Sequence, residues 1–314
     1  WQSNTCVGFQ ENSQAPQRIR ILDQNKCWSM IGRQNAEQVL SLGRDCQYTG
    51  IAAHEIGHAL GLYHTQARPD RDNYVTINWN NILKAESYNF DKAANTDNFG
   101  VPYELGSNMH YHPFSFTSNN YATLSAKDPL YQNSMGGRLP TFYDILLVNK
   151  YYNCFEVNCK GVSVNCQNGG VQDVRNCRQC KCPPGYAGTS CENFDSRYRR
   201  LTPTTGYLSE NVNVDSRSPN AFTAVASEGF YVIEAPAGKH IELKVTNLRV
   251  QRAFWDCMVA GVMVWTSADT RSSGIRFCSQ NQVAPTYLSQ GNRMFVQAWS
   301  NIGATSMTLT YRYY

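Results

Sequence analysis

Three of the six histidines in this 314-residue chain lie within one short stretch, "HEIGHALGLYH" at 54–64. On an α-helix of 3.6 residues per turn, His54 and His58 lie on the same face, one turn apart. Both imidazoles can therefore bind one metal ion. Glu55 is adjacent to the first histidine and is placed to act on a water bound to that ion rather than to bind the metal itself.

His64 would face another side if the helix continued. Gly61 can adopt a positive φ, end the helix and turn the chain back, so we expect His64 to be a third ligand. Three neutral imidazoles with an open fourth position are typical of catalytic zinc. Such an ion acidifies its water and polarises a peptide carbonyl, while Glu55 takes the proton and passes it to the leaving amine. The alternative is a helix whose histidines face solvent or pack by chance.

A methionine in "SNMHY" at 107–111 bears on the same site. Zinc peptidases with an extended histidine motif place a methionine turn beneath their ligands. We therefore expect Met109 to form a hydrophobic floor under the three imidazoles. Without the histidine motif, Met109 would be interpreted as an ordinary core residue.

The stretch "HEIGHALGLYHTQARPDRDNYVTINW" together with "SNMHY" resembles the astacin family of zinc endopeptidases. The resemblance implies one zinc ion per chain, with Tyr111 as a ligand in addition to the three histidines. It also implies that Tyr111 swings away when substrate binds and then helps to stabilise the oxyanion. Glu55 and Tyr111 would then be the catalytic residues. A phenol merely buried in the core is the alternative for Tyr111.

The elements that must position these residues are visible in the apolar patterning. "AEQVLSL" at 36–42 is close to the alternation of a strand, and residues 50–64 and 141–154 carry apolar residues at helical spacing. By resemblance, residues 37–46 should form the edge strand on which substrate lies antiparallel. Family members also place a strand and a long helix before the first cysteine, here Cys6, so we expect the upper lobe of the domain to be incomplete.

Two further positions bear on specificity and activation. Arg138, in "MGGRLPTFYD" at 135–144, matches a setting in which several relatives carry an arginine and favour acidic residues just after the scissile bond. A partly desolvated guanidinium pairs bidentately with a carboxylate, so we expect Arg138 to bind substrate. A surface arginine that never meets substrate is the alternative. The residue after the third histidine is usually Glu in the family, where it meets the mature N-terminus, but here it is Thr65.

Twelve cysteines, even in number and clustered, favour disulfides in an oxidising compartment, so we expect a secreted protein. Six of them, the last three within "CKCPPGYAGTSC" at 180–191, have a spacing that resembles an EGF-like module. A zinc knuckle is the rival interpretation. Spacing alone leaves the pairing open. The resemblances imply the pairs Cys6–Cys154, Cys27–Cys46, Cys159–Cys177, Cys166–Cys180 and Cys182–Cys191.

From about residue 200 onward, short strand-like runs are separated by turn-forming residues, which favours an antiparallel sandwich. This part resembles a CUB domain, including the spacing of Cys257 and Cys278, and "ENFDSRYRRLTP" at 192–203 is expected to be a linker. Neither appended module shows the acidic pattern of calcium-binding versions, so we expect no calcium there.

The predicted fold class is α+β with three parts. A metzincin-like zinc protease domain, N-terminally incomplete, is expected over 1–154, an EGF-like module over 155–192, and a linker with an all-β CUB-like sandwich over 193–314. A net charge of +4 gives no indication of nucleic-acid or anionic-membrane binding. No apolar run approaches the ~20 residues of a membrane span, so we expect no transmembrane segment.

The leading hypothesis is a secreted zinc metalloendopeptidase that cleaves extracellular matrix, cuticle or egg-envelope proteins by attack of zinc-bound water. The EGF-like and CUB-like modules would bind protein partners or position the protease. The alternative is a catalytically inactive extracellular adhesion protein built on a protease scaffold. Retention of Glu55 and all three histidines favours the enzyme.

Overall fold

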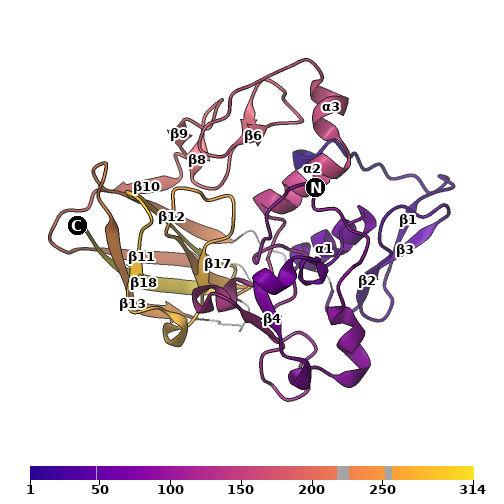
Figure 1. Ribbon diagram of the computed structural model, residues 1–314, viewed down its shortest axis with the longest axis horizontal. Helices are drawn as coiled ribbons and strands as arrows, with labels where there is room; N and C mark the ends of the chain where they lie inside the picture. The colour runs from indigo at the N-terminus through magenta and orange to yellow at the C-terminus, as the bar shows by residue number, and fades with distance from the viewer. Residues whose placement is uncertain (47, 218–225, 252–256) are drawn as a thin grey trace. The chain divides into compact units, whose positions relative to one another are not determined.

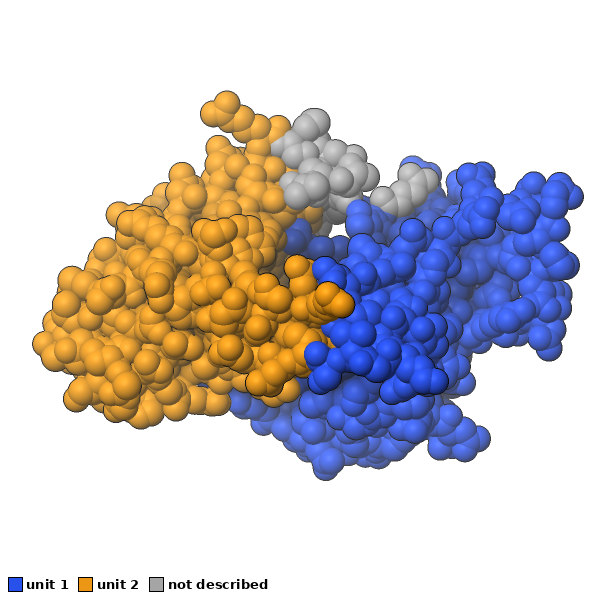
Figure 2. Space-filling view, turned by 90° about the horizontal axis from the view of Figure 1, so that it is seen from above, with its two compact units in different colours: residues 1–163, 173–177 blue, residues 164–172, 178–314 orange. Residues whose placement is uncertain are grey.

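The computed structural model describes residues 1–46, 48–217, 226–251 and 257–314. They form two compact units (Figures 1 and 2), of which the first comprises residues 1–163 and 173–177 and the second residues 164–172 and 178–314. The cysteine-rich segment that resembles a single module is thus divided between the two units. Among the described residues, no helix combines the length and the apolar character needed to cross a membrane.

A three-stranded sheet in unit 1 supports the histidine-bearing helix. Its order is β1 (Ile19–Leu22), β3 (Gln38–Leu42), β2 (Cys27–Ser29), with β1 parallel and β2 antiparallel to β3. The expectation that residues 37–46 form the edge strand is wrong, because β3 is hydrogen-bonded on both sides. The buried Leu40 marks β3 as the central strand, while Trp28 leaves β2 as the partly exposed antiparallel edge.

The two helices that the periodicity predicts in unit 1 both form, as α1 and α2, but they are shorter than expected. Helix α2 begins with a capping box, in which Thr141 Oγ1 accepts from the Asp144 amide and an Asp144 carboxylate oxygen accepts from the Thr141 amide. The other helices and strands of unit 1 are α1 (Thr49–Ala59), β4 (Val75–Ile77), β5 (Leu124–Ala126), α2 (Phe142–Tyr151) and α3 (Cys154–Cys159), with short 3₁₀ helices at Gln2–Asn4, Thr65–Ala67, Arg71–Asn73, Trp79–Asn81, Lys84–Phe90 and Pro129–Ser134.

Unit 2 is a two-layered β-sandwich (Figure 1) preceded by two small hairpin-like pairings. Its sheets have the orders β10-β12-β17-β14-β15 and β11-β18-β13-β16. Val232 and Phe295 of the first sheet and Leu243 and Leu309 of the second are completely buried. The strands are β6 (Val171–Gln172), β7 (Cys180–Lys181), β8 (Tyr186–Ala187), β9 (Asn193–Phe194), β10 (Tyr198–Leu201), β11 (Leu208–Ser216), β12 (Ser227–Glu234), β13 (Ile241–Val250), β14 (Ala260–Trp265), β15 (Ile275–Phe277), β16 (Tyr287–Leu288), β17 (Arg293–Ser300) and β18 (Gly303–Tyr313), with a 3₁₀ helix at Gln280–Gln282.

The expected antiparallel sandwich is confirmed with one exception, at its edge. Strand β10 pairs parallel to β12, so part of the segment 192–203, expected to be a linker, belongs to the sheet. Tyr198 and Leu201 are buried at its two ends. The two arginines between them are exposed and form ion pairs with Glu210 and Glu234. Because of these exposed arginines the segment reads as a polar linker in the sequence, although it forms a short strand.

Six disulfides join the described cysteines. In unit 1 they are Cys6–Cys154, Cys27–Cys46 and Cys159–Cys177, and in unit 2 they are Cys166–Cys180, Cys182–Cys191 and Cys257–Cys278. These are the pairs that the resemblances imply.

Candidate metal centre

The three histidines of the motif converge at one point. Nε2 of His64 lies 3.2 Å from Nε2 of His54 and 3.2 Å from Nε2 of His58. The Nδ1 atoms of His54 and His58 donate to the carbonyls of Asn108 (2.7 Å) and Leu62 (2.8 Å), which leaves each Nε2 with its lone pair. With Zn–N bonds of about 2.0–2.1 Å in a tetrahedral site, ligand nitrogens lie roughly 3.3 Å apart. The donor set therefore fits zinc.

The return of the chain to bring His64 into place depends on Gly61. Helix α1 ends at Ala59, and Gly61 adopts a φ of 100°. Its amide donates to the carbonyl of His58 (2.8 Å), and the amide of Leu62 donates to that of Gly57 (3.0 Å), as in a Schellman motif. The expectation that Gly61 ends the helix with a positive φ is confirmed.

Met109 lies directly against the histidine-bearing helix. Its side chain is 1% exposed and packs with Leu60, Leu62 and Val148. A Cβ atom added to Gly57 would lie 2.6 Å from Met109 Sδ, so only glycine permits this approach without a shift. Sequence reasoning did not single out Gly57, although its place between the two helical histidines could have suggested a close packing contact.

Glu55 occupies a buried position beside the histidines. It is 4% exposed, and its Oε2 atom has no hydrogen-bond partner among the described residues. Burial raises the pKa of Glu55 to about 7. A carboxyl group that titrates near neutrality can both accept and release a proton there.

Tyr111 packs directly against the third histidine. Their ring centroids are 4.4 Å apart, and Phe90 and Phe116 contact the phenol ring at 5.7 and 5.5 Å. Burial raises the pKa of Tyr111, so the phenol stays protonated at neutral pH unless a cation binds it. The sequence motif and the structure thus place Tyr111 next to His64.

A buried carboxylate that sequence reasoning missed supports the site from α2. Asp144 accepts from Ser107 Oγ (2.5 Å) and from the Asn108 amide (2.9 Å), and Asn108 in turn accepts from His54. Burial raises the pKa of Asp144. The pattern Thr141-x-x-Asp144 before an apolar run is a capping signal and could have drawn attention to this residue.

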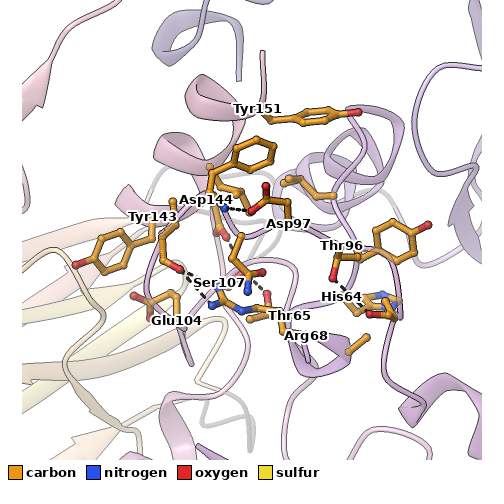
Figure 3. Close-up of a pocket in the computed structure, with 18 of the residues that line it drawn as sticks. His64, Thr65, Arg68, Thr96, Asp97, Glu104, Ser107, Tyr143, Asp144 and Tyr151 are labelled. Carbon is orange, nitrogen blue, oxygen red and sulfur yellow. Dashed lines mark hydrogen bonds between the residues drawn. The ribbon is translucent and has the colours of Figure 1, made fainter. Parts of the chain in front are cut away.

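A cavity of about 290 Å³ lies beside His64 (Figure 3). Thr65, Ser107 and Asp144 are among its lining residues. The Thr65 hydroxyl donates to Ser107 Oγ (2.9 Å), while the Thr65 amide donates to the carbonyl of Met109 (2.9 Å). Thr65 therefore joins the third-histidine segment to the methionine turn through neutral hydrogen bonds.

The loop that carries Arg138 is fastened to the methionine turn. The amide of Gly137 donates to the carbonyl of Ser107 (2.8 Å), and the carbonyl of Gly137 accepts from Asn108 Nδ2 (3.0 Å). Arg138 is half-buried and follows this anchor directly. Its approach to substrate stays a prediction.

This chain is similar to several known proteins. The family model for astacin, a family of peptidases, matches residues 1–153. Zinc metalloproteinase nas-31 of Caenorhabditis elegans is 36% identical over 99% of this chain and 51% of its own length, and nas-17 of the same organism is 35% identical over 99% and 72%. Blastula protease 10 of Paracentrotus lividus is 33% identical over 99% and 53%.

A solved structure also matches, that of high choriolytic enzyme 1, a hatching enzyme zinc-protease from Oryzias latipes. The identity is 36%, the match covers 48% of this chain and 76% of that one, and the TM-score is 0.46. The chain spans about half the length of several curated relatives that it matches.

Proposed function

Because this chain belongs to the astacin family of peptidases, we propose that it is a secreted endopeptidase that depends on zinc. The observation that carries the proposal is the convergence of three Nε2 atoms, 3.2 Å from His64 to each of the others, beside the buried carboxyl of Glu55. Two of the relatives are named zinc metalloproteinases, which supports the choice of metal.

His54, His58 and His64 would hold the ion, with Tyr111 as a fourth protein ligand. When bound, zinc supplies Lewis-acid polarisation of the scissile carbonyl and of a water molecule. The carbonyls of Asn108 and Leu62 fix the tautomer and the orientation of the two helical imidazoles.

Glu55 moves the proton in the proposed reaction. Its carboxylate accepts a proton from the attacking water and delivers it to the nitrogen of the scissile amide as the C–N bond breaks. A pKa of about 7 suits both halves of this transfer near neutral pH. The Tyr111 phenol donates a hydrogen bond to the oxyanion that forms on the former carbonyl oxygen.

Substrate is proposed to bind as an extended strand. In the three-stranded sheet of unit 1, β2 is the edge strand that runs antiparallel to its neighbour, and its Trp28 is 37% exposed. Backbone pairing along Cys27–Ser29 would therefore orient the peptide. Arg138 is proposed to recognise an acidic side chain just after the scissile bond. Extracellular matrix, cuticle or egg-envelope proteins are proposed as substrates, by resemblance to the family alone.

The remaining parts are proposed to be EGF-like and CUB-like modules that bind protein partners or position the protease. Three disulfides between Cys159 and Cys191 support the first assignment, and the two-sheet sandwich with its Cys257–Cys278 bond supports the second. Neither module is proposed to bind calcium.

The test is a measurement of zinc content and of casein cleavage by the same purified protein. One zinc per chain together with cleavage that stops on chelation and returns with zinc is the expected result. Stoichiometric zinc without cleavage would instead favour an adhesion protein on a protease scaffold. Absence of zinc binding by folded protein would contradict the metal centre.

A further inference from the structure

The main chain of Tyr111 is held on both sides. Its N–H donates to Gln66 Oε1 (3.0 Å), and its carbonyl accepts from His110 Nδ1 (2.6 Å). We propose that Gln66 and His110 are positioning residues that clamp the Tyr111 backbone, so that its phenol reaches the metal site through side-chain rotation alone. The inference rests on the proposed function, in which Tyr111 is a metal ligand.

The Gln66 half of the clamp sets the distance between Tyr111 and the third histidine. Gln66 lies two residues after His64 and is 0% exposed. Beside it, the amide of Thr65 donates to the carbonyl of Met109 (2.9 Å). Two neighbouring hydrogen bonds therefore join the segment after His64 to the segment before Tyr111. This linkage holds the two rings at 4.4 Å.

A buried glutamine at this position is costly unless its oxygen is needed. Gln66 Nε2 has no hydrogen-bond partner among the described residues, and a buried polar group without a partner lowers stability. Packing alone would therefore favour an apolar side chain of the same length. The acceptor that satisfies the Tyr111 amide is the feature that glutamine provides and an apolar residue lacks.

A buried arginine connects this clamp to the phenol ring. Arg71 Nη1 donates to the carbonyls of Gln66 (3.0 Å) and Phe90 (2.5 Å). The Phe90 ring meets the Tyr111 ring edge to face at 5.7 Å. The residue that holds the Tyr111 main chain and one that contacts its ring are thus fixed by the same guanidinium.

The His110 half of the clamp has a defined tautomer. Because a carbonyl only accepts, Nδ1 of His110 must carry the proton that it donates to Tyr111, and Nε2 must accept from the Tyr103 hydroxyl (2.8 Å). Tyr103 is itself buried and stacked on Tyr74, with centroids 4.5 Å apart. Both ring nitrogens of His110 are therefore engaged away from the metal, which gives this motif histidine a role other than ligation.

The experiment replaces the Gln66 acceptor and observes the phenol directly. In copper(II)-loaded protein, a coordinated phenolate gives a visible ligand-to-metal charge-transfer band. We expect the band in the unaltered protein, and a weaker or shifted band in Gln66→Met. The matched control is Gln38→Met, since Gln38 is another buried glutamine of unit 1 but bonds to Gly32 and Gln34 instead.

A second pair of variants, with smaller changes, tests the proposal if Gln66→Met does not fold. Tyr103→Phe removes only the hydroxyl that orients His110, and we expect a smaller change of the copper band in the same direction. Tyr74→Phe, which removes a hydroxyl from the stacked neighbour without touching His110, should leave the band unchanged.

Kinetics of the zinc enzyme give an independent measure. Gln66→Met should lower kcat by roughly tenfold or more with little change in KM, as expected when a transition-state group is misplaced. In a Tyr111→Phe background, the same substitution should cost little more, because Gln66 acts through the phenol. Equal losses in both backgrounds would show a purely structural role for Gln66 and overturn the inference.

The spectroscopic outcomes separate the two proposals. A band present in the unaltered protein and unchanged in both Gln66→Met and Tyr103→Phe would overturn the clamp but leave Tyr111 as a ligand. Absence of the band from copper-loaded unaltered protein would overturn Tyr111 as a ligand, and the clamp with it. Zinc content and casein cleavage test the enzyme assignment independently of both.

Discussion

His54 Nδ1 lies 2.7 Å from the carbonyl oxygen of Asn108, so helix α1 is hydrogen-bonded to the methionine turn. The Asn108 amide is held in turn by Asp144 at 2.9 Å. The orientation of an imidazole on α1 therefore depends on a carboxylate at the start of α2. Partners of this kind tune a metal site although they never touch the ion.

Asp144→Asn should weaken zinc binding by about 10–100-fold, as is usual when a partner of a metal ligand is lost. An amide offers only one acceptor oxygen, whereas the carboxylate serves both Ser107 and Asn108. Competition with a chromophoric chelator measures the zinc affinity. Asp91→Asn, at an exposed site, is the control, and equal affinity of the two variants would contradict the role of Asp144.

Glu55→Ala should abolish most peptide hydrolysis while zinc stays bound, because Glu55 handles a proton and is not a ligand. The loss in kcat/KM should be of order 10²-fold or more. Zinc content and cleavage are measured on the same sample, with Glu156→Ala as an exposed control. Near-full activity of Glu55→Ala would rule out the proposed mechanism.

Gly57→Ala should destabilise the protein even though alanine favours helices by about 1 kcal/mol over glycine. The new Cβ would lie 2.6 Å from Sδ of Met109, whose side chain is buried. Overpacking of this kind typically lowers the free energy of unfolding by about 1–3 kcal/mol. Gly8→Ala, whose Cβ meets nothing within 4 Å, is the matched control. Urea denaturation measures both, and a more stable Gly57→Ala protein would show that Met109 moves aside freely.

Arg138→Ala should reduce the preference for Asp or Glu just after the scissile bond. The loss corresponds to about 1.5–3 kcal/mol if a charge-assisted hydrogen bond is removed from a desolvated pocket. Cleavage of a peptide library by the unaltered protein, by Arg138→Ala and by the exposed control Arg44→Ala gives the comparison. Identical residue preferences in all three would remove Arg138 from the subsite.

The metal-free protein should lose stability as the pH falls from 6.5 towards 4. Burial lowers the pKa of His58 and of His110 from 6.5 to about 4, and lowers those of the other two ligand histidines. Below pH 6.5 the unfolded chain therefore binds protons that the folded chain does not, at about 1.4 kcal/mol per histidine and pH unit. Glu55, whose pKa burial raises to about 7, has the opposite effect on the free energy of unfolding between pH 4.5 and 7. It is one group against four histidines, so acidification lowers the stability overall.

Urea midpoints of chelator-treated protein at several pH values measure this effect. Zinc-loaded protein should keep its midpoint to lower pH, since the ion binds the neutral imidazoles. Midpoints that do not change on acidification of the metal-free protein would contradict the prediction.

The convergence of the three histidines could be predicted from the sequence because their geometry is local. His54, His58 and Gly61 lie within two turns of one helix and its end, where spacing translates directly into position. The contacts that Asp144 and Gln66 make with the site could not be found this way, although the capping pattern that contains Asp144 is itself local. Their partners lie 36 and 45 residues distant in the chain, and no periodicity encodes such contacts.

Strand order illustrates the same limit at the level of the fold. The alternation at 36–42 identifies a strand, and β3 is indeed there, but its neighbours depend on pairing with β1 and β2. Alternation within one strand says which residues face the core and nothing about whether another strand covers each edge. The strand β10 could not be recognised for a related reason, since its two exposed arginines are adjacent between two buried end residues and show no alternation.

The path of the chain through the cysteine-rich segment determines whether cleavage of one peptide bond can separate the two fragments. Between residues 163 and 178 the chain passes from unit 1 to unit 2, back to unit 1, and again to unit 2. Any cut between Cys159 and Cys177 falls inside the loop that their disulfide closes, and a cut from there to Cys180 falls inside the loop of Cys166–Cys180. Proteolysis at one bond in this stretch therefore leaves the two fragments joined by a disulfide, and their separation requires reduction as well as cleavage.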